Sequence, residues 1–159
     1  MGLSGSKPAK VPLEVNQKLT TLEFDTQFGV GDDRVLDDPN EDQRLIGRLL
    51  YLIMTRPDVA FAVQYLSQFM HCPKISHMEA AIRMVKNVKQ SSGLRVLLSA
   101  EASTQLTAFC DADWGSCPNT RWSITGYLIK FGNFIIPWKS KKQTTISRSS
   151  AEAKYHYLA

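Results

Sequence analysis

The chain has 159 residues, of which 43% are hydrophobic and 9% aromatic, enough for one ordinary core or two small units. No apolar run reaches about 18 residues, no hydrophobic leader opens the chain, and its three cysteines and three histidines have no metal-ligand spacing. This argues against a membrane span, a secretory signal, disulfides and zinc, and predicts an intracellular protein of the cytoplasm or nucleus. Residues 1–43 carry four bases and nine acids, but residues 44–159 carry fifteen bases and six acids, so the second part either attracts a polyanion or is a solvated basic surface.

Residues 1–41 are predicted to form an irregular arm. Gly2, Gly5, Pro8 and Pro12 interrupt regular structure, and an acidic run follows over residues 32–38. Little of the segment shows a helical or strand period. We therefore divide the chain into this arm, a helical connection region at 42–92 and a β-rich region at 93–159.

Three helices are predicted where apolar residues recur at helical spacing. The first covers residues 42–54, and the second covers 57–70 with Pro57 in its opening turn. The third begins at a capping box in residues 76–79 and stops before Gly93. The inner faces are expected to carry Leu45, Ile46, Leu49, Leu50 and Ile53, then Val59, Ala62, Val63, Leu66 and Phe69, then Met78, Ala81, Ile82, Val85 and Val88.

The remaining chain reads as strands followed by one helix. Strands are expected over residues 94–98, 106–110, 122–130 and 134–138, the last two joined by a two-residue turn at Gly132 and Asn133. Pro137 has no N–H to donate, so it should lie on an edge or near a strand end. Ser149 and Ser150 cap the final helix. Its sheet-facing side is predicted to carry Ala151, Tyr155 and Leu158.

An aspartate pair at the end of the 106–110 strand is the candidate site. Asp111 and Asp113 would project from a sheet edge, where carboxylates bind divalent metal. The alternative is that Asp111, Asp113 and Asn119 are turn residues without a ligand role.

The chain resembles the Pol polyprotein of copia-type retrotransposons, a family common in plants. The similarity follows family order through residues 43–52, 55–58, 66–70, 109–115, 121–126, 138–143 and 147–150. It implies an α+β protein in which residues 1–100 correspond to the late reverse transcriptase and connection region, and 104–159 to the beginning of a ribonuclease H domain. The expected fold is a three-helix connection segment followed by an incomplete ribonuclease H-like fold of antiparallel strands and a first helix.

The resemblance also implies where metal ligands belong. The family's first ribonuclease H aspartate falls on Asp111, with Asp113 a nearby acid, and the glutamate of its helix falls on Lys154. Glu152 would supply the missing carboxylate only if the helix were rotated about its axis. The parent family uses Mg²⁺. Here a lysine stands in place of the glutamate, and the family's other acids are expected after the end of this segment. The resemblance therefore predicts a vestigial site that binds no metal productively. The family's polymerase aspartates lie upstream, and Asp32 and Asp33 do not replace them.

Basic residues near the predicted hairpin are the candidate nucleic-acid contacts, since backbone binding needs no catalytic carboxylate. They are Lys139, Lys141, Lys142, Arg148 and Arg121. The expected partner is an RNA–DNA hybrid or other nucleic acid, bound weakly and in a salt-dependent way. Exposed sheet edges would also favour self-association or a partner chain. No membrane partner is expected.

The resulting hypothesis is a catalytically inactive fragment of a copia-type Pol protein, of the reverse transcriptase and ribonuclease H type, with residual nucleic-acid binding. Two alternatives stay open. One is a Mg²⁺-dependent endonuclease for RNA–DNA hybrids, using Asp111, Asp113 and Glu152 with acids from another chain. The other is a non-enzymatic nucleic-acid or protein interaction module that uses the basic surface of residues 83–148.

Overall fold

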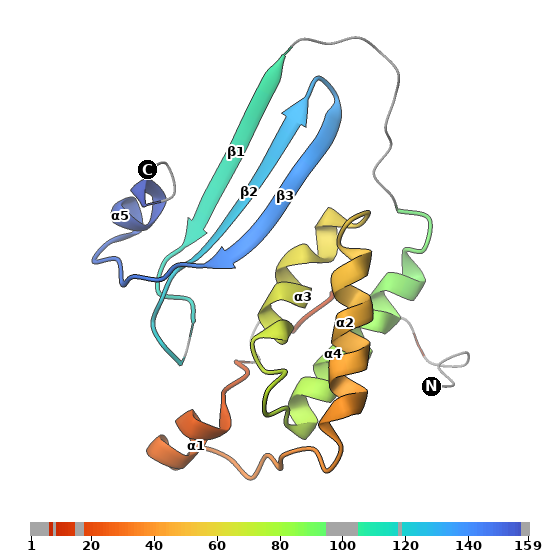
Figure 1. The fold of residues 1–159 in the computed structure, drawn as a ribbon, viewed down its shortest axis with the longest axis vertical. Helices are drawn as coiled ribbons and strands as arrows, with labels where there is room; N and C mark the ends of the chain where they lie inside the picture. The colour runs from red at the N-terminus through yellow and green to blue at the C-terminus, as the bar shows by residue number, and fades with distance from the viewer. Residues whose placement is uncertain (1–6, 8, 15–17, 95–104, 118, 157–159) are drawn as a thin grey trace. The chain divides into compact units, whose positions relative to one another are not determined.

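The computed structural model describes residues 7, 9–14, 18–94, 105–117 and 119–156. The fold is α+β, as the sequence predicts, and it divides into two compact units, Met1–Leu94 and Arg95–Ala159. The first unit is helical, and the second holds an antiparallel sheet and one helix (Figure 1).

The helical unit contains the three predicted helical stretches with shifted bounds. They are α2 (Pro39–Leu52), a 3-10 turn η1 (Pro57–Val59) leading into α3 (Ala60–Ser67), and α4 (Ile75–Gln90). Helix α2 begins earlier than residue 42 because Asp38 caps it, its Oδ1 accepting from the N–H of Asn40 at 2.9 Å, and Pro39 fits the first turn.

Apolar faces of α2, α3 and α4 meet in one core. The face predicted from Val59 to Phe69 is fully buried, and Ile46 and Leu49 join it, whereas Leu45, Leu50 and Ile53 pack at its margin. In α4 the deepest residues are Ala81 and Met84, and Val85 and Val88 lie partly buried beside them.

One helix in the predicted irregular arm was missed. Helix α1 (Leu22–Phe28) is capped by Thr21, whose Oγ1 accepts from the N–H of Phe24 at 3.3 Å. None of its residues is buried. A helix without a buried face has no apolar period, so the pattern that identified the others was absent.

The start of α4 also differs from the prediction. Lys74, not Ser76, is the N-cap residue, and the Nδ1 atom of His77 accepts from the Lys74 N–H at 3.0 Å. Ser76 lies inside the helix and donates its own N–H to Asp33 Oδ1 at 3.3 Å. The capping interaction is therefore made by the ring of His77, the residue after Ser76, and the cap itself lies two residues before the predicted serine.

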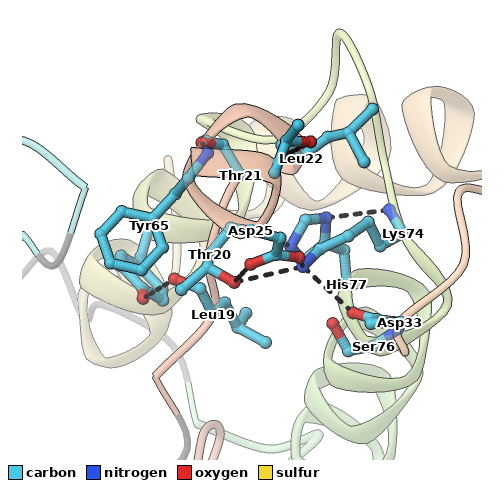
Figure 2. Close-up of polar contacts among 12 residues, drawn as sticks. Leu19, Thr20, Thr21, Leu22, Asp25, Asp33, Tyr65, Lys74, Ser76 and His77 are labelled. Atoms are coloured by element: carbon cyan, nitrogen blue, oxygen red, sulfur yellow. Dashed lines mark hydrogen bonds and ion pairs between the residues drawn. The ribbon is translucent and has the colours of Figure 1, made fainter. Parts of the chain in front are cut away.

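A buried polar group, the Lys74 cluster, joins the segment around α1 to the start of α4 (Figure 2). It consists of Thr20, Asp25, Asp33, Lys74 and His77. The side chain of Lys74 is 2% exposed, and its Nζ lies 2.5 Å from Asp25 Oδ2, 3.3 Å from Asp33 Oδ2 and 3.2 Å from Thr20 Oγ1. A lysine so deeply buried requires such partners, because an unpaired charge in the interior is costly.

Protonation in the Lys74 cluster follows from its contacts. Burial raises the pKa of Asp25, but the hydrogen bonds from Lys74 and Thr20 lower it overall. Burial lowers the pKa of His77 to about 4, with the Lys74 charge adding to the effect. The ring is therefore neutral at pH 7. Its Nε2 lies 3.1 Å from the Thr20 carbonyl oxygen and carries the proton, because Nδ1 is already an acceptor.

The sheet unit consists of β1 (Leu106–Asp113), β2 (Ile124–Phe131), β3 (Phe134–Lys142) and α5 (Ser150–Tyr155). The strands lie in the order β1-β2-β3, and both pairs are antiparallel. The predicted turn is confirmed, with Phe131 opposite Phe134 and Gly132 at a φ of 58°. The strand expected at 94–98 falls almost wholly outside the described residues.

Two strands extend further than predicted, with consequences for the site. β1 continues to Asp113, so Asp111 lies within the strand opposite Gly126 rather than at its end. β3 continues past Pro137 to Lys142, because the register shifts between Leu128 and Lys130 and pairing resumes at Trp138. Within the described sheet β3 is an edge strand, which suits the proline. None of the described helices is both long and apolar enough to span a membrane.

We expect the free energy of unfolding of the helical unit to fall at acidic pH, because His77 takes up a proton more readily in the unfolded chain than in the folded one. Its pKa is about 4 in the folded state against an ordinary 6.5, so the unfolded chain takes up the proton first and stability is lost as pH falls from 6.5 towards 4. Between about pH 7.5 and about pH 5, the wild type should lose about 2 kcal/mol more than His77→Gln, which stays neutral. Urea unfolding followed by helical circular dichroism measures this difference, and equal losses in the two proteins would contradict it.

Candidate functional site

Helix α5 begins at a well-formed cap. Ser149 Oγ accepts from the Glu152 N–H at 3.1 Å, as predicted for a capping serine, and Glu152 Oε2 accepts from the Arg148 N–H at 2.6 Å. This hydrogen bond from Arg148 lowers the pKa of the Glu152 carboxyl, and His156 adds to the effect with its Nε2 at 3.4 Å from Oε1. Glu152 is thus engaged at the helix start.

The side-chain amide of Gln143 joins α5 to the sheet. Its Nε2 donates to Thr125 Oγ1 at 2.8 Å and to the Ala153 carbonyl oxygen at 2.7 Å, while Oε1 accepts from Ser147 Oγ at 3.0 Å. Its backbone N–H bonds the Ser123 carbonyl oxygen at 2.8 Å. The amide connects β2, the loop before α5 and α5 itself.

The buried side of α5 is not the predicted one. Ala153 is 0% exposed, whereas Ala151 is exposed and Tyr155 is 72% exposed. Ala151 and Tyr155 do face β1, but across a pocket rather than in packed contact. Leu158 lies outside the described residues. The small alanine is buried because Gln143 draws the helix backbone onto the sheet at Ala153.

Lys154 and Asp111 face each other across this pocket. The Lys154 Nζ lies 3.4 Å from Asp111 Oδ1, which also accepts from the Ala112 N–H at 2.9 Å. Both side chains are well exposed, Lys154 at 60% and Asp111 at 83%. The pocket has a volume of about 360 Å³ and is lined by Cys110, Asp111, Ala112, Thr125, Ala151, Lys154 and Tyr155.

The residues of this pocket do not fit a bound Mg²⁺. Among the described residues, Asp111 is the one carboxylate that lines it, and Asp113 and Glu152 do not. Within the described residues, no group of three His, Cys, Asp or Glu side chains is arranged to hold a metal. Mg²⁺ requires several oxygen ligands, and here an ammonium group contacts the sole carboxylate.

Three of the predicted nucleic-acid contacts meet in a second pocket. Lys139, Lys141 and Lys142 line a hollow of about 460 Å³ beside α5; we call it the lysine pocket. Its other lining residues are Thr125, Tyr127, Gln143, Thr144, Thr145 and His156. Arg121 and Arg148 are exposed and do not line it. Lys142 Nζ sits 5.3 Å from the centre of the Trp122 ring.

The structural role of Gln143 was not predicted, although this residue lies inside a motif that carries the family resemblance. Its partners Thr125 and Ala153 are 18 and 10 residues away, and only the folded sheet brings them together. A glutamine directly after a strand was the available signal, and it is too common to identify a junction.

Comparison with known proteins gives consistent relatives. The chain is 33% identical over 160 residues to an uncharacterized mitochondrial protein of Arabidopsis thaliana, covering 99% of this chain and 62% of the relative. It is 36% identical over 154 residues to the retrovirus-related Pol polyproteins from transposons RE1 and RE2 of the same plant, covering 97% of this chain. The chain spans only 10% of each of those two polyproteins. No protein-family model matches the chain, and no solved structure matches it.

We expect Gln143→Glu to destabilise the sheet unit. The substitution keeps the size of the side chain but removes both N–H donors, leaving Thr125 Oγ1 and the Ala153 carbonyl oxygen without them. The cost should be at least about 2 kcal/mol, about 1 for each lost hydrogen bond. All three tryptophans lie in this unit, so urea unfolding followed by tryptophan fluorescence reports on it. The exposed neighbour Thr144→Ala is the control, and equal midpoints for the two variants would contradict the role of Gln143.

Proposed function

Because this chain belongs to the family of copia-type, retrovirus-related Pol polyproteins of transposons, we propose that its sheet unit corresponds to the beginning of a ribonuclease H domain in which Lys154 has taken the place of a metal ligand. As a consequence, the chain does not hydrolyse RNA–DNA hybrids. Its remaining activity is weak, salt-dependent binding of nucleic acid through the basic residues of the sheet unit. The cytoplasm or nucleus is the location that fits this function.

The ion pair of Lys154 with Asp111 carries the proposal. The resemblance assigns these two positions to metal ligands, and the structure brings them within 3.4 Å from two separate elements. An ammonium group there repels a divalent ion. Two unit charges at 4 Å repel by about 1 kcal/mol in water and about 4 at a protein surface, and a double charge doubles these values.

Glu152 is poorly placed to restore the site. Its carboxylate accepts the Arg148 N–H and contacts His156, so metal binding would have to break the start of α5. This observation supports the inactive form over the alternative in which Asp111, Asp113 and Glu152 form a nuclease with another chain.

Nucleic-acid binding is supported by the lysine pocket. Three lysines on β3 contribute positive charge in one hollow, which suits neutralisation of backbone phosphates and the release of their counterions. Such binding needs no metal and survives the loss of the catalytic carboxylates.

We expect Lys154→Glu to gain affinity for Mn²⁺ by at least about tenfold over the wild type, since removing even about 1.4 kcal/mol of repulsion has that effect. Titration calorimetry of the full chain measures it. The double change Asp111→Asn with Lys154→Glu should lose the gain, because the second carboxylate is then missing. In parallel, the wild type should leave a labelled RNA–DNA hybrid intact in Mg²⁺ or Mn²⁺. Cleavage by the wild type that disappears in Asp111→Ala would establish the nuclease alternative instead.

A further inference from the structure

The lysine pocket differs from the paired cations of the described structure, because it gathers three lysines without a negative partner. Lys74, Arg56, Arg83 and Lys154 each pair with a carboxylate. By contrast, none of the ion pairs in the described part of the chain includes Lys139, Lys141 or Lys142. None of the described aspartates or glutamates lines the pocket. Three positive charges therefore share one hollow without compensation.

Strand geometry gathers these charges on one face. Lys139 and Lys141 alternate along β3, so their side chains leave the same face of the sheet about 7 Å apart at their base. Their register partners on β2 are Tyr127 and Thr125, which also line the pocket. At that spacing two ammonium groups repel by about 0.6 kcal/mol in water and more at a surface of lower dielectric. A bound anion relieves this repulsion.

The walls of the pocket are held in place by the contacts already described. Gln143 lines it and is fixed through Thr125, Ser147 and Ala153. Lys142 is held over the Trp122 ring. Thr144 and Thr145 add exposed hydroxyls that donate well to phosphate oxygens. The pocket thus presents ammonium and hydroxyl donors on a fixed frame.

We propose that the lysine pocket is the phosphate-binding subsite for a nucleic-acid backbone, with Lys139 and Lys141 making the principal contacts. This inference rests on the proposed function, which it deepens by naming the surface and the chemical group that is bound. A membrane surface fits less well, because no aliphatic side chain lines the pocket and stable membrane binding through such a surface needs buried apolar area as well as charge.

The experiment uses the full chain and a fluorescein-labelled RNA–DNA hybrid, followed by anisotropy in EDTA so that metal binding plays no part. Wild type is compared with the double variant Lys139→Gln and Lys141→Gln across a salt series from about 50 to about 200 mM. The matched control is the double variant Lys86→Gln and Lys130→Gln, which removes the same two charges from α4 and β2, outside the pocket. Tryptophan fluorescence of each variant verifies that the sheet unit is folded.

We expect the double variant to bind about tenfold more weakly at the lowest salt and to show a salt slope reduced by roughly two, one for each lost phosphate contact. The double control Lys86→Gln and Lys130→Gln should stay within about twofold of the wild type. Equal weakening by this control would overturn the subsite in favour of general charge. So would inorganic phosphate binding as tightly as the hybrid, or binding to phosphatidylserine vesicles without binding to the hybrid.

The outcomes also separate this inference from the proposed function. Salt-dependent hybrid binding that is unchanged in the double variant removes the subsite and leaves the proposed nucleic-acid binding standing. Absence of salt-dependent binding in the wild type removes both. The claim that Lys154 excludes metal is decided independently by the Mn²⁺ titration.

Discussion

The hydrogen bonds of the Gln143 amide fix where α5 lies on the sheet, and the two pockets described above depend on that position. By binding the Ala153 carbonyl oxygen, Gln143 sets the rotation of a short helix that has one buried residue of its own. That rotation directs Lys154 towards Asp111 on one side and leaves His156 beside β3 on the other. A helix of six residues has little propensity to form alone, so its geometry comes from this contact and from the Ser149 cap.

The Lys154 contact acts on the electrostatics of the site far more than on the stability of the fold. An ion pair this exposed contributes about 0–1 kcal/mol. A metal ion is different, because its binding requires several oxygen ligands and tolerates no positive neighbour. If Lys154 has replaced a carboxylate, as proposed, that single change would leave the sheet and helix intact while reversing the charge that the pocket presents. Under the proposed function, the framework of strands and helix would therefore persist after the loss of metal binding.

Elements that depend on one local sequence pattern were predicted correctly from the sequence. The apolar period from Val59 to Phe69 identified the centre of the helical core, and Gly132 identified the hairpin. Where stability comes from long-range polar contacts, the sequence was silent: α1 has no buried face, and the Gln143 junction joins residues with no local pattern. The family motif placed Asp111 and Lys154 opposite each other, but the helix period chose Ala151 and Tyr155 over the buried Ala153. A periodic pattern predicts the buried face of a helix from the size and polarity of its side chains. It contains no information about a hydrogen bond from elsewhere in the chain to the helix backbone.

Lysines in this chain show that the surroundings of a charge decide what it does. Lys74 is enclosed by Asp25, Asp33 and Thr20, so its ammonium group joins two segments of the chain and is not accessible to a ligand. Lys154 has one exposed partner, Asp111, and is proposed to exclude other cations from its pocket. Lys139 and Lys141 stand in a pocket without acids, and the described structure gives them no ion pair, so their charge is available to an anion from outside. Residue type and net charge are the same in all three cases. The number of carboxylates within reach separates the structural lysine from the lysine proposed to exclude a metal and from the lysines proposed to bind phosphate.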